Sequence, residues 1–464
     1  MYVATITIYL VIIVAIGVYF RRYISGVEDF ALAGRSLGLP VLVGTLFASY
    51  IGGATVVGWT GSFYAMGAAW WFSGIGGVLG IVFATVVMAE RSRKLRQFTV
   101  PDLLAIRYDN STRYVSAVMI IIGDIAIVTV QILAIAGILT TFTDLTRVPA
   151  MVIGVVAFTL ISLFGGMKGV AFTDSLQALL IFGGLLAGVI LLFNNHGGFG
   201  ILGADTPDGY FQPFTNTDGL GAFNMAIAVF GTTAVSQAII FNRVFSARDE
   251  RVAKKALTLL IPLALAGYCM VALLGWGGQA VLGPDVLPDD VFATVVTELM
   301  PAVVGALLLA TVAAAIVTST NSILLSASIN LTRDLYRQLI RRDASTIELR
   351  KVGQAAVVVF ALLSFGLAVA MPDIVTAVVF AYTMYAAALL VPLYAGYLWR
   401  GATAAAGTAS VVTGGGTALI WYQLDDPLGL PPMVPALVLS LAVMVVVSAF
   451  TRKPSEQQLS VFDA

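Results

Sequence analysis

Five consecutive side chains that carry a hydroxyl or an amide lie within an otherwise apolar segment: Thr318, Ser319, Thr320, Asn321 and Ser322. Thr318 and Ser322 are four residues apart, so a helix places them on one face. Neutral oxygens suit a hard cation such as sodium, because they coordinate it without burying a full negative charge. Alternatively, such side chains donate to the carbonyl four residues back or pack helices together. The length of the run favours an ion site at least as much as packing.

A second unusual segment runs from Val43 to Gly58 and has Gly52 and Gly53 at its centre. A glycine inside a helix costs about 1 kcal/mol relative to alanine. Unwound backbone within a membrane is tolerated only where it faces protein or a water-filled cavity. In transporters, such broken helices hold the ion and the substrate. The alternative is close helix packing through small residues.

Two acidic residues occur inside apolar segments. Asp124 lies about 15 Å from one end of its segment at the helical rise per residue, which is near mid-depth, and Gln131 follows it. A carboxylate there costs at least ~2.5 kcal/mol unless it is paired or hydrated. Asp124 is therefore an ion or proton relay, or a hydrogen-bonded acid that fixes packing. Asp174 lies near a helix start, where an acid interacts favourably with the helix dipole.

The elements that position these residues must be membrane helices. The chain has 464 residues, of which 59% are hydrophobic and 11% charged, whereas soluble proteins have about 25% charged residues. Zero net charge argues against a nucleic-acid partner. Cys269 and His196 are the only residues of their types, which excludes a Cys/His metal centre and a Ser-His-Asp triad. We therefore expect no enzymatic activity.

Apolar segments of roughly 20 residues predict an all-α polytopic membrane protein with about thirteen transmembrane helices. Residues 2–20 are expected to be a retained helix, because Arg21 and Arg22 follow them in place of a cleavage site. The expected spans cover residues 2–20, 39–63, 68–89, 114–142, 148–165, 172–193, 219–241, 254–282, 300–331, 351–371, 374–398, 402–422 and 432–450.

Basic residues fall in alternate loops between these spans, with Arg147 as the one exception. Because positively charged loops remain in the cytoplasm, the N-terminus is expected outside and the C-terminus in the cytoplasm of a cell whose plasma membrane holds the protein. No soluble linker interrupts the spans, so residues 1–464 are expected to form a single transmembrane domain.

Six sequence motifs in the same order resemble the sodium:solute symporter family, which includes sodium–proline, sodium–pantothenate, sodium–glucose and sialic acid transporters. The resemblance covers nearly the whole chain. The motifs are Asp29 to Leu37, Thr99 to Tyr108, Gly165-Gly166-Met167, Gln237 to Arg243 with Ser246 to Asp249, Thr332 to Tyr336, and Pro392 to Arg400.

The resemblance implies two inverted five-helix repeats, the core of the leucine-transporter type. Residues 39–193 are expected to form the first repeat and residues 219–398 the second. Residues 1–38, with the first helix and its loop, and residues 402–464, with the last helices and tail, are expected to be peripheral.

The family's sodium site pairs the first broken helix with the span that contains the polar run. Matching positions assign backbone carbonyls to Ala48, Ile51 and Ala315, and hydroxyls to Thr318 and Ser319. Asp174, Asn321 and Ser322 correspond to the ion's exit route or to a second sodium site. Some relatives have two serines in place of Asn321 and Ser322, so the two interpretations stay open.

The resemblance also implies a solute cavity between spans two, three, seven and eleven. A sugar is disfavoured, because Gly74 and Thr233 stand where the sugar carriers have a glutamate and an aromatic gate, and unpaired buried hydroxyls are costly. A small amino acid or carboxylate is favoured instead. The substrate-binding candidates are Tyr50, Gly53, Thr55, Phe230, Thr233, Gln237 and Tyr382.

The sequence thus predicts a sodium-coupled symporter that imports a small organic solute by alternating access and works in the lipid bilayer as a monomer. The first alternative is a proton-coupled carrier that uses Asp124 or Asp174. The second is a transport-like membrane sensor, which the short stretch after Lys453 disfavours.

Overall fold

The computed structural model describes Ile12, Ile16 and residues 27–164, 166–204, 206–212, 219–424, 426–456 and 458–459. Within these residues the chain is helical and contains no β-strand beyond an isolated bridge between Leu37 and Ala247. The first-half helices are α2 (Val27–Leu32), α3 (Leu39–Tyr50), the π-helical η3 (Ala54–Gly58), α4 (Trp59–Met66), α5 (Trp71–Val87), α6 (Ala89–Lys94), α7 (Val100–Arg107), α8 (Asn110–Phe142), α9 (Arg147–Phe164), α10 (Gly166–Asn195) and α11 (Ile201–Ala204).

The described residues of the second half of the chain are also helical. Its helices are α12 (Gly219–Val235), the π-helical η6 (Gln237–Phe241), α13 (Asn242–Ser246), α14 (Glu250–Leu282), α15 (Val291–Glu298), α16 (Ala302–Ile329), the π-helical η8 (Asn330–Ile340), α17 (Thr346–Ala370), α18 (Ile374–Leu398), α19 (Ala404–Gln423) and α20 (Met433–Phe450).

Within the described part of the chain, eight helices are long and apolar enough to cross a membrane, or nine if one bent pair is counted as a span. Each expected span from residue 39 onward falls on a helix or on a broken pair of helices. The expected first span, residues 2–20, lies outside the described residues apart from Ile12 and Ile16. The all-α polytopic architecture is therefore confirmed, whereas the count of thirteen spans stays a prediction.

Two helices are interrupted in the middle of the bundle. α3 ends at Tyr50, Ile51 leaves the helical region with φ −88° and ψ 71°, and η3 restarts the helix at Ala54. In the second half, Ser236 separates α12 from η6, and the two parts are bent by 42°. The Ser236 side chain accepts from the backbone N–H of Ile239 at 3.2 Å, so it caps the new helix start.

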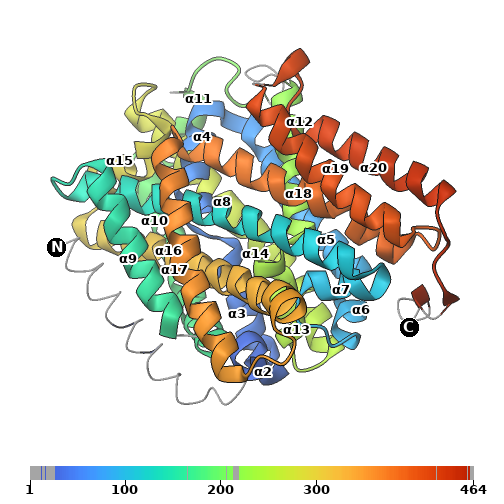
Figure 1. Cartoon of the computed structure of the whole chain (residues 1–464). Helices are drawn as coiled ribbons and strands as arrows, with labels where there is room; N and C mark the ends of the chain where they lie inside the picture. The colour runs from blue at the N-terminus through green and yellow to red at the C-terminus, as the bar shows by residue number, and fades with distance from the viewer. Residues whose placement is uncertain are drawn as a thin grey trace.

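The two broken helices pack against long helices of the bundle. α3 packs against α10 and α14, α12 packs against α5 and α18, and α16 packs against α8 and α10. α19 and α20, shown in red, pack side by side along α18 at one edge of the bundle (Figure 1). This arrangement puts both breaks among α8, α16 and α18, and leaves the last two helices at the periphery.

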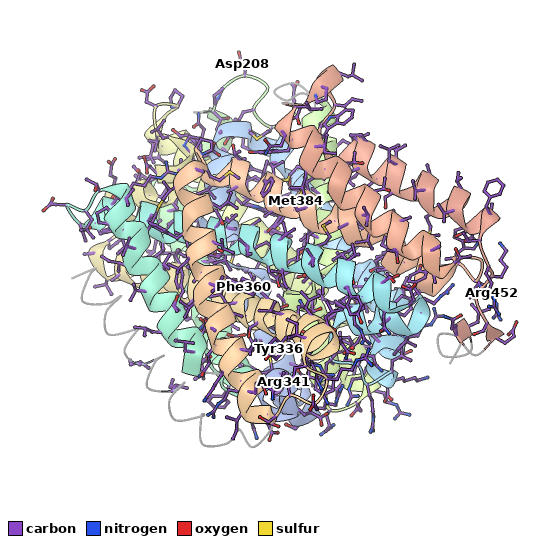
Figure 2. All side chains as sticks on the ribbon, in the orientation of Figure 1. Asp208, Tyr336, Arg341, Phe360, Met384 and Arg452 are labelled. Carbon is purple, nitrogen blue, oxygen red and sulfur yellow. The ribbon has the colours of Figure 1, made fainter. Side chains whose placement is uncertain are left out.

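Charged loops gather at the two ends of the bundle. Figure 2 shows Asp208 at the upper end and Arg341 at the lower end. At the lower end, Arg35 donates to the carbonyl of Arg96 at 2.8 Å, and Arg93 donates to the carbonyl of Ala247 at 2.7 Å. The basic loops after α2, α6 and α13 therefore lie at the same end of the bundle. The placement of basic residues in alternate loops of the sequence predicts this. The side of the membrane that each end faces stays a prediction.

Candidate functional site

The hydroxyl of Thr318 joins the polar run in α16 to the end of α3. It lies 3.0 Å from the carbonyl oxygen of Ala48 and 3.0 Å from that of Ala315. All three residues are buried. The Thr318 hydroxyl thus lies within hydrogen-bond distance of two backbone carbonyls, and these three neutral oxygens are of the kind that bind a hard cation.

Ser319 extends this group of oxygens toward the break in α3. Its hydroxyl donates to the carbonyl of Ser49 at 3.3 Å. A methyl group added to Gly52 would lie 2.3 Å from the Ser319 oxygen, so only glycine allows this approach. Ile51 lies at the break itself, where its N–H still bonds to the carbonyl of Phe47. All five expected sodium ligands therefore lie at the junction of α16 with the broken helix, although no contact of the Ile51 carbonyl with Thr318 or Ser319 is seen.

Asp174 in α10 forms a buried ion pair with Arg243 of α13. The distance from Arg243 Nη2 to Asp174 Oδ2 is 3.2 Å, and both side chains are almost completely buried. The same carboxylate oxygen accepts from Thr45 at 2.6 Å and from Ser49 at 3.4 Å. The sequence did not predict this pairing, because Asp174 was expected inside a span and Arg243 in a basic loop after residue 241.

Asn321 and Ser322, the other two candidates for a second ion site, also have protein partners. The Asn321 amide oxygen accepts from Ser162 of α9 at 2.9 Å, and the Ser322 hydroxyl accepts from Arg243 at 2.6 Å. Asp174 and Ser322 are thus brought together by one guanidinium, while Asn321 bonds toward a different helix.

A small cavity lies between the two helix breaks. Its volume open to water is about 30 Å³, which is room for one or two water molecules. Four of the seven expected solute-binding residues line it: Tyr50, Thr55, Thr233 and Tyr382. The cavity lies among α3, α12 and α18, together with residues of α8, α14 and α16, and no residue of the third expected span, 68–89, lines it. Its role as the solute site stays a prediction.

The other three expected solute-binding residues do not line this cavity. Phe230 packs against Phe83, with ring centroids 5.7 Å apart. Gln237 accepts from the backbone N–H of Val100 at 2.9 Å and donates to Asn330 at 2.9 Å. A methyl group on Gly53 would lie 2.2 Å from Ile316 Cγ1, so Gly53 is packed against α16.

Four polar residues that line the cavity were absent from the expected set: Ser49, Gln131, Thr232 and Tyr268. Tyr268 of α14 donates to the hydroxyl of Tyr50 at 2.7 Å and stacks on Trp59, with ring centroids 4.7 Å apart. Gln131 of α8 lines the cavity, and its buried side-chain oxygen has no hydrogen-bond partner among the described residues. A buried polar atom without a partner is unusual, so Gln131 is a strong candidate for contact with a bound molecule. The feature of the sequence that could have identified Gln131 was the occurrence of this polar residue within an apolar span.

Asp124 of α8 is completely buried. It lies near Ser326 of α16 and Tyr385 of α18. In the described part of the chain, no hydrogen bond of normal geometry reaches either of its carboxyl oxygens. Its surroundings are thus polar, but it has no basic partner of the kind that Arg243 gives Asp174.

Comparisons with known proteins identify the family and the fold. Residues 30–414 match the sodium:solute symporter family. A sodium/proline symporter of Haemophilus influenzae is 26% identical over 99% of this chain and 96% of its own length. The osmoregulated proline transporter OpuE of Bacillus subtilis is 23% identical over 99% of this chain and 97% of its own length.

Solved structures share the fold. A sodium-coupled sialic acid symporter in a substrate-bound, outward-open state superposes with a TM-score of 0.83 at 18% identity, over 98% of each chain. MhsT in complex with L-phenylalanine superposes with a TM-score of 0.60 at 15% identity, over 88% of this chain and 98% of its own. The helices around the two breaks thus form a core of the leucine-transporter type.

Proposed function

This chain belongs to the sodium:solute symporter family, and on that premise we propose that it imports a small amino acid or carboxylate with sodium by alternating access. It is a multi-pass membrane transporter and not an enzyme. The observation that carries the proposal is the approach of Thr318 to the carbonyl of Ala48 at 3.0 Å, beside the break in α3. There a bound sodium ion would hold the two helices together.

The donor set supports sodium in preference to a divalent ion. The proposed ligands are the carbonyls of Ala48, Ile51 and Ala315 and the hydroxyls of Thr318 and Ser319, which carry no net charge. Divalent cations in proteins usually have carboxylate ligands, whereas Asp174, which accepts from Ser49 beside this group, is paired with Arg243. A monovalent ion therefore fits best.

One sodium ion supplies enough energy for strong accumulation. An ion entering across 100 mV gains about 2.3 kcal/mol, and a tenfold concentration gradient adds about 1.4 kcal/mol. Together these support a solute gradient of roughly several hundredfold. In our proposal the protein lies in the plasma membrane as a monomer with the N-terminus outside. The sodium gradient and the membrane potential, both directed into the cell, drive import.

The cavity and the relatives favour a small solute with a charged group. Relatives that cover nearly the whole chain are proline transporters. The small cavity has room for only one or two water molecules here, so we propose that it widens when the solute binds. Its lining then offers the hydroxyls of Tyr50, Thr55 and Thr233 and the unpartnered oxygen of Gln131. The carboxylate of an amino acid can accept from these hydroxyls, and its ammonium can donate to Gln131. We therefore propose L-proline as the first solute to test.

A proton-coupled carrier is the second candidate, and Asp124 is the observation that favours it. A completely buried carboxyl without a basic partner among the described residues is a default candidate for proton relay in membranes. Asp174 suits that role less well, because Arg243 neutralises it.

A thermal-shift screen of the purified protein tests both candidates. Amino acids, monocarboxylates, vitamins and sugars are each added in sodium chloride and in potassium chloride. Because ligand stabilisation follows occupancy, we expect L-proline or a similar solute to raise Tm only when sodium is present. Stabilisation that ignores sodium and changes with pH would instead favour the proton-coupled carrier.

A further inference from the structure

An apolar groove lies where α3, α10 and α14 pack against one another. Its volume is about 600 Å³, which lies within the range of pockets that hold small organic molecules. One wall consists of Phe172, Leu176 and Leu179 of α10, whose side chains are 43%, 49% and 75% exposed. Since α10 is long and apolar enough to cross a membrane, the groove opens toward the surrounding lipid.

The lining of the groove is almost wholly apolar. Among the described lining residues, Ser175 alone has a polar side chain, and its hydroxyl donates to the carbonyls of Val41 at 3.0 Å and Ala171 at 2.6 Å. A polar solute would lose its hydrogen bonds to water here without replacement, which is costly. The groove therefore suits a hydrocarbon chain, which is stabilised by burial of apolar surface alone.

Basic residues lie at one end of this groove. Lys168 precedes Phe172 by four residues, so a helix places both on one face of α10. Lys255 of α14 precedes the exposed Leu259 by four residues, and Leu263 of the groove follows four residues later. Both lysines lie in the first two turns of their helices, at the end where α3 also begins. Lysines at a membrane surface attract anionic lipids, so this end of the groove favours an anionic headgroup.

The groove also adjoins the half-helix that ends at the first break. Phe47 lines it, and the Phe47 carbonyl accepts from the N–H of Ile51 at the break. Ala48, the next residue, contributes a carbonyl to the proposed sodium site. On the same side, a methyl group added to Gly44 would lie 2.8 Å from the Cα of Ser175, so α3 and α10 are in close contact. A chain in the groove would therefore cover the seam between these two helices.

We propose that the groove binds one acyl chain of an anionic phospholipid from the surrounding bilayer, with the headgroup at Lys168 and Lys255. The bound chain fills the space beside α3 and α10 and stabilises their contact. The site takes lipid whichever solute and ion the protein carries, because none of the candidate solute-binding residues lines the groove.

The test measures Tm of the purified protein during titration with phosphatidylglycerol, and separately with phosphatidylcholine of the same acyl chains. The variants are Gly183→Leu, which fills the groove, and Lys168→Gln, which removes a charge at its mouth. Gly183 lines the groove, and a Cβ added there meets no atom within 4 Å, so leucine can enter the groove without a clash. Gly366→Leu in α17 is the matched control, because that position is equally open but lies outside the groove.

We expect phosphatidylglycerol to raise Tm of the wild type and of Gly366→Leu at lower concentrations than phosphatidylcholine does. Gly183→Leu should lose this response. Lys168→Gln should need roughly 5-fold more phosphatidylglycerol for half of the effect, with an unchanged response to phosphatidylcholine. Wild-type titrations for Gly183→Leu would overturn the proposal. So would equal losses in both glycine variants, or equal effects of the two lipids on the wild type.

Crosslinking tests the other possible occupants of the groove. With Cys269→Ser as the background, Gly183→Cys is oxidised alone and together with Ile12→Cys. We expect no crosslink in either protein when phosphatidylglycerol is present. A crosslink between two copies through residue 183 would assign the groove to a second copy of the chain, and one between residues 12 and 183 would assign it to residues 2–20. Either result would overturn the lipid site.

Discussion

The hydroxyl of Thr318 and the backbone carbonyl of Ala48 lie 3.0 Å apart, and this contact joins α16 to the last turn of α3 before its break. The two residues are 270 positions apart in the chain. A cation bound between them would connect the two halves of the fold, so its release would free one half to move relative to the other. This relationship provides a physical link between sodium occupancy and conformation.

Replacement of Thr318 should weaken sodium binding selectively. Thr318→Ala removes one oxygen ligand, and a bond to a charged group contributes about 1.5–3 kcal/mol. The sodium concentration that gives half of the maximal thermal stabilisation should rise roughly 10- to 100-fold, whereas Thr318→Ser should resemble the wild type. Thr320→Ala is the matched control, because Thr320 donates to Ile316 of its own helix at 2.7 Å. Equal sodium titrations for Thr318→Ala and the wild type would contradict the assigned site.

Gly53 should not tolerate a side chain. A methyl group there would lie 2.2 Å from Ile316 Cγ1 and 2.6 Å from Gln131 Oε1, and such overpacking costs about 1–3 kcal/mol. Gly53→Ala should therefore lower Tm and abolish stabilisation by the solute. Gly366→Ala in α17 meets no atom within 4 Å and should raise stability by up to about 1 kcal/mol. Melting curves of both variants check this prediction, and wild-type behaviour of Gly53→Ala would argue against a tightly packed break.

Gln131 should determine solute affinity without affecting sodium. Its side-chain oxygen lines the cavity and has no partner in the described part of the structure. If it accepts from a charged group of the solute, Gln131→Ala should reduce solute affinity roughly 10- to 100-fold. Thr129→Ala, on the same helix, is the control, because Thr129 donates to the carbonyls of Ile125 and Ser364. Calorimetric titration with the solute measures the effect, and an unchanged affinity would remove Gln131 from the site.

The half-buried carboxyl of Asp289 should make the stability of the fold depend on pH. Asp289 lies in the short turn η7 (Pro288–Asp290) and accepts from the backbone N–H of Ile374 at 3.2 Å. Burial raises the pKa of Asp289, and the nearby Asp373 and Asp290 add to this increase, whereas Ile374 and Arg147 oppose it.

Because the folded-state pKa is the higher one, the protonated form stabilises the fold. This contribution is complete below the ordinary aspartate pKa of about 3.9 and is lost as the pH rises through the folded-state pKa. Asp289→Asn keeps an acceptor for Ile374 without the charge, so its Tm should exceed that of the wild type at neutral pH and match it near pH 4. A Tm difference that does not change with pH would show that the charge has no such effect.

The sequence predicted the helical architecture and the break at Gly52-Gly53, because both depend on local composition and periodicity. The ion-binding role of Thr318 and Ser319 stays a prediction. It did not predict Arg243 as the partner of Asp174, or Tyr268 as the partner of Tyr50, because these contacts join distant helices. Gln237 was expected at the cavity, but the bend at Ser236 and the π-helical turn after it change the direction in which its side chain points. Phe230, in α12 before the bend, packs instead against Phe83.

The most direct test of sodium coupling at Thr318 is solute uptake into proteoliposomes over a range of external sodium concentrations. The solute is the one identified by the thermal-shift screen, and wild-type protein is compared with Thr318→Ala and Thr320→Ala. We expect an inward sodium gradient to drive accumulation in the wild type and in Thr320→Ala, and Thr318→Ala to require far more sodium. Uptake that a pH gradient drives equally well without sodium, with Thr318→Ala unaffected, would contradict the sodium site.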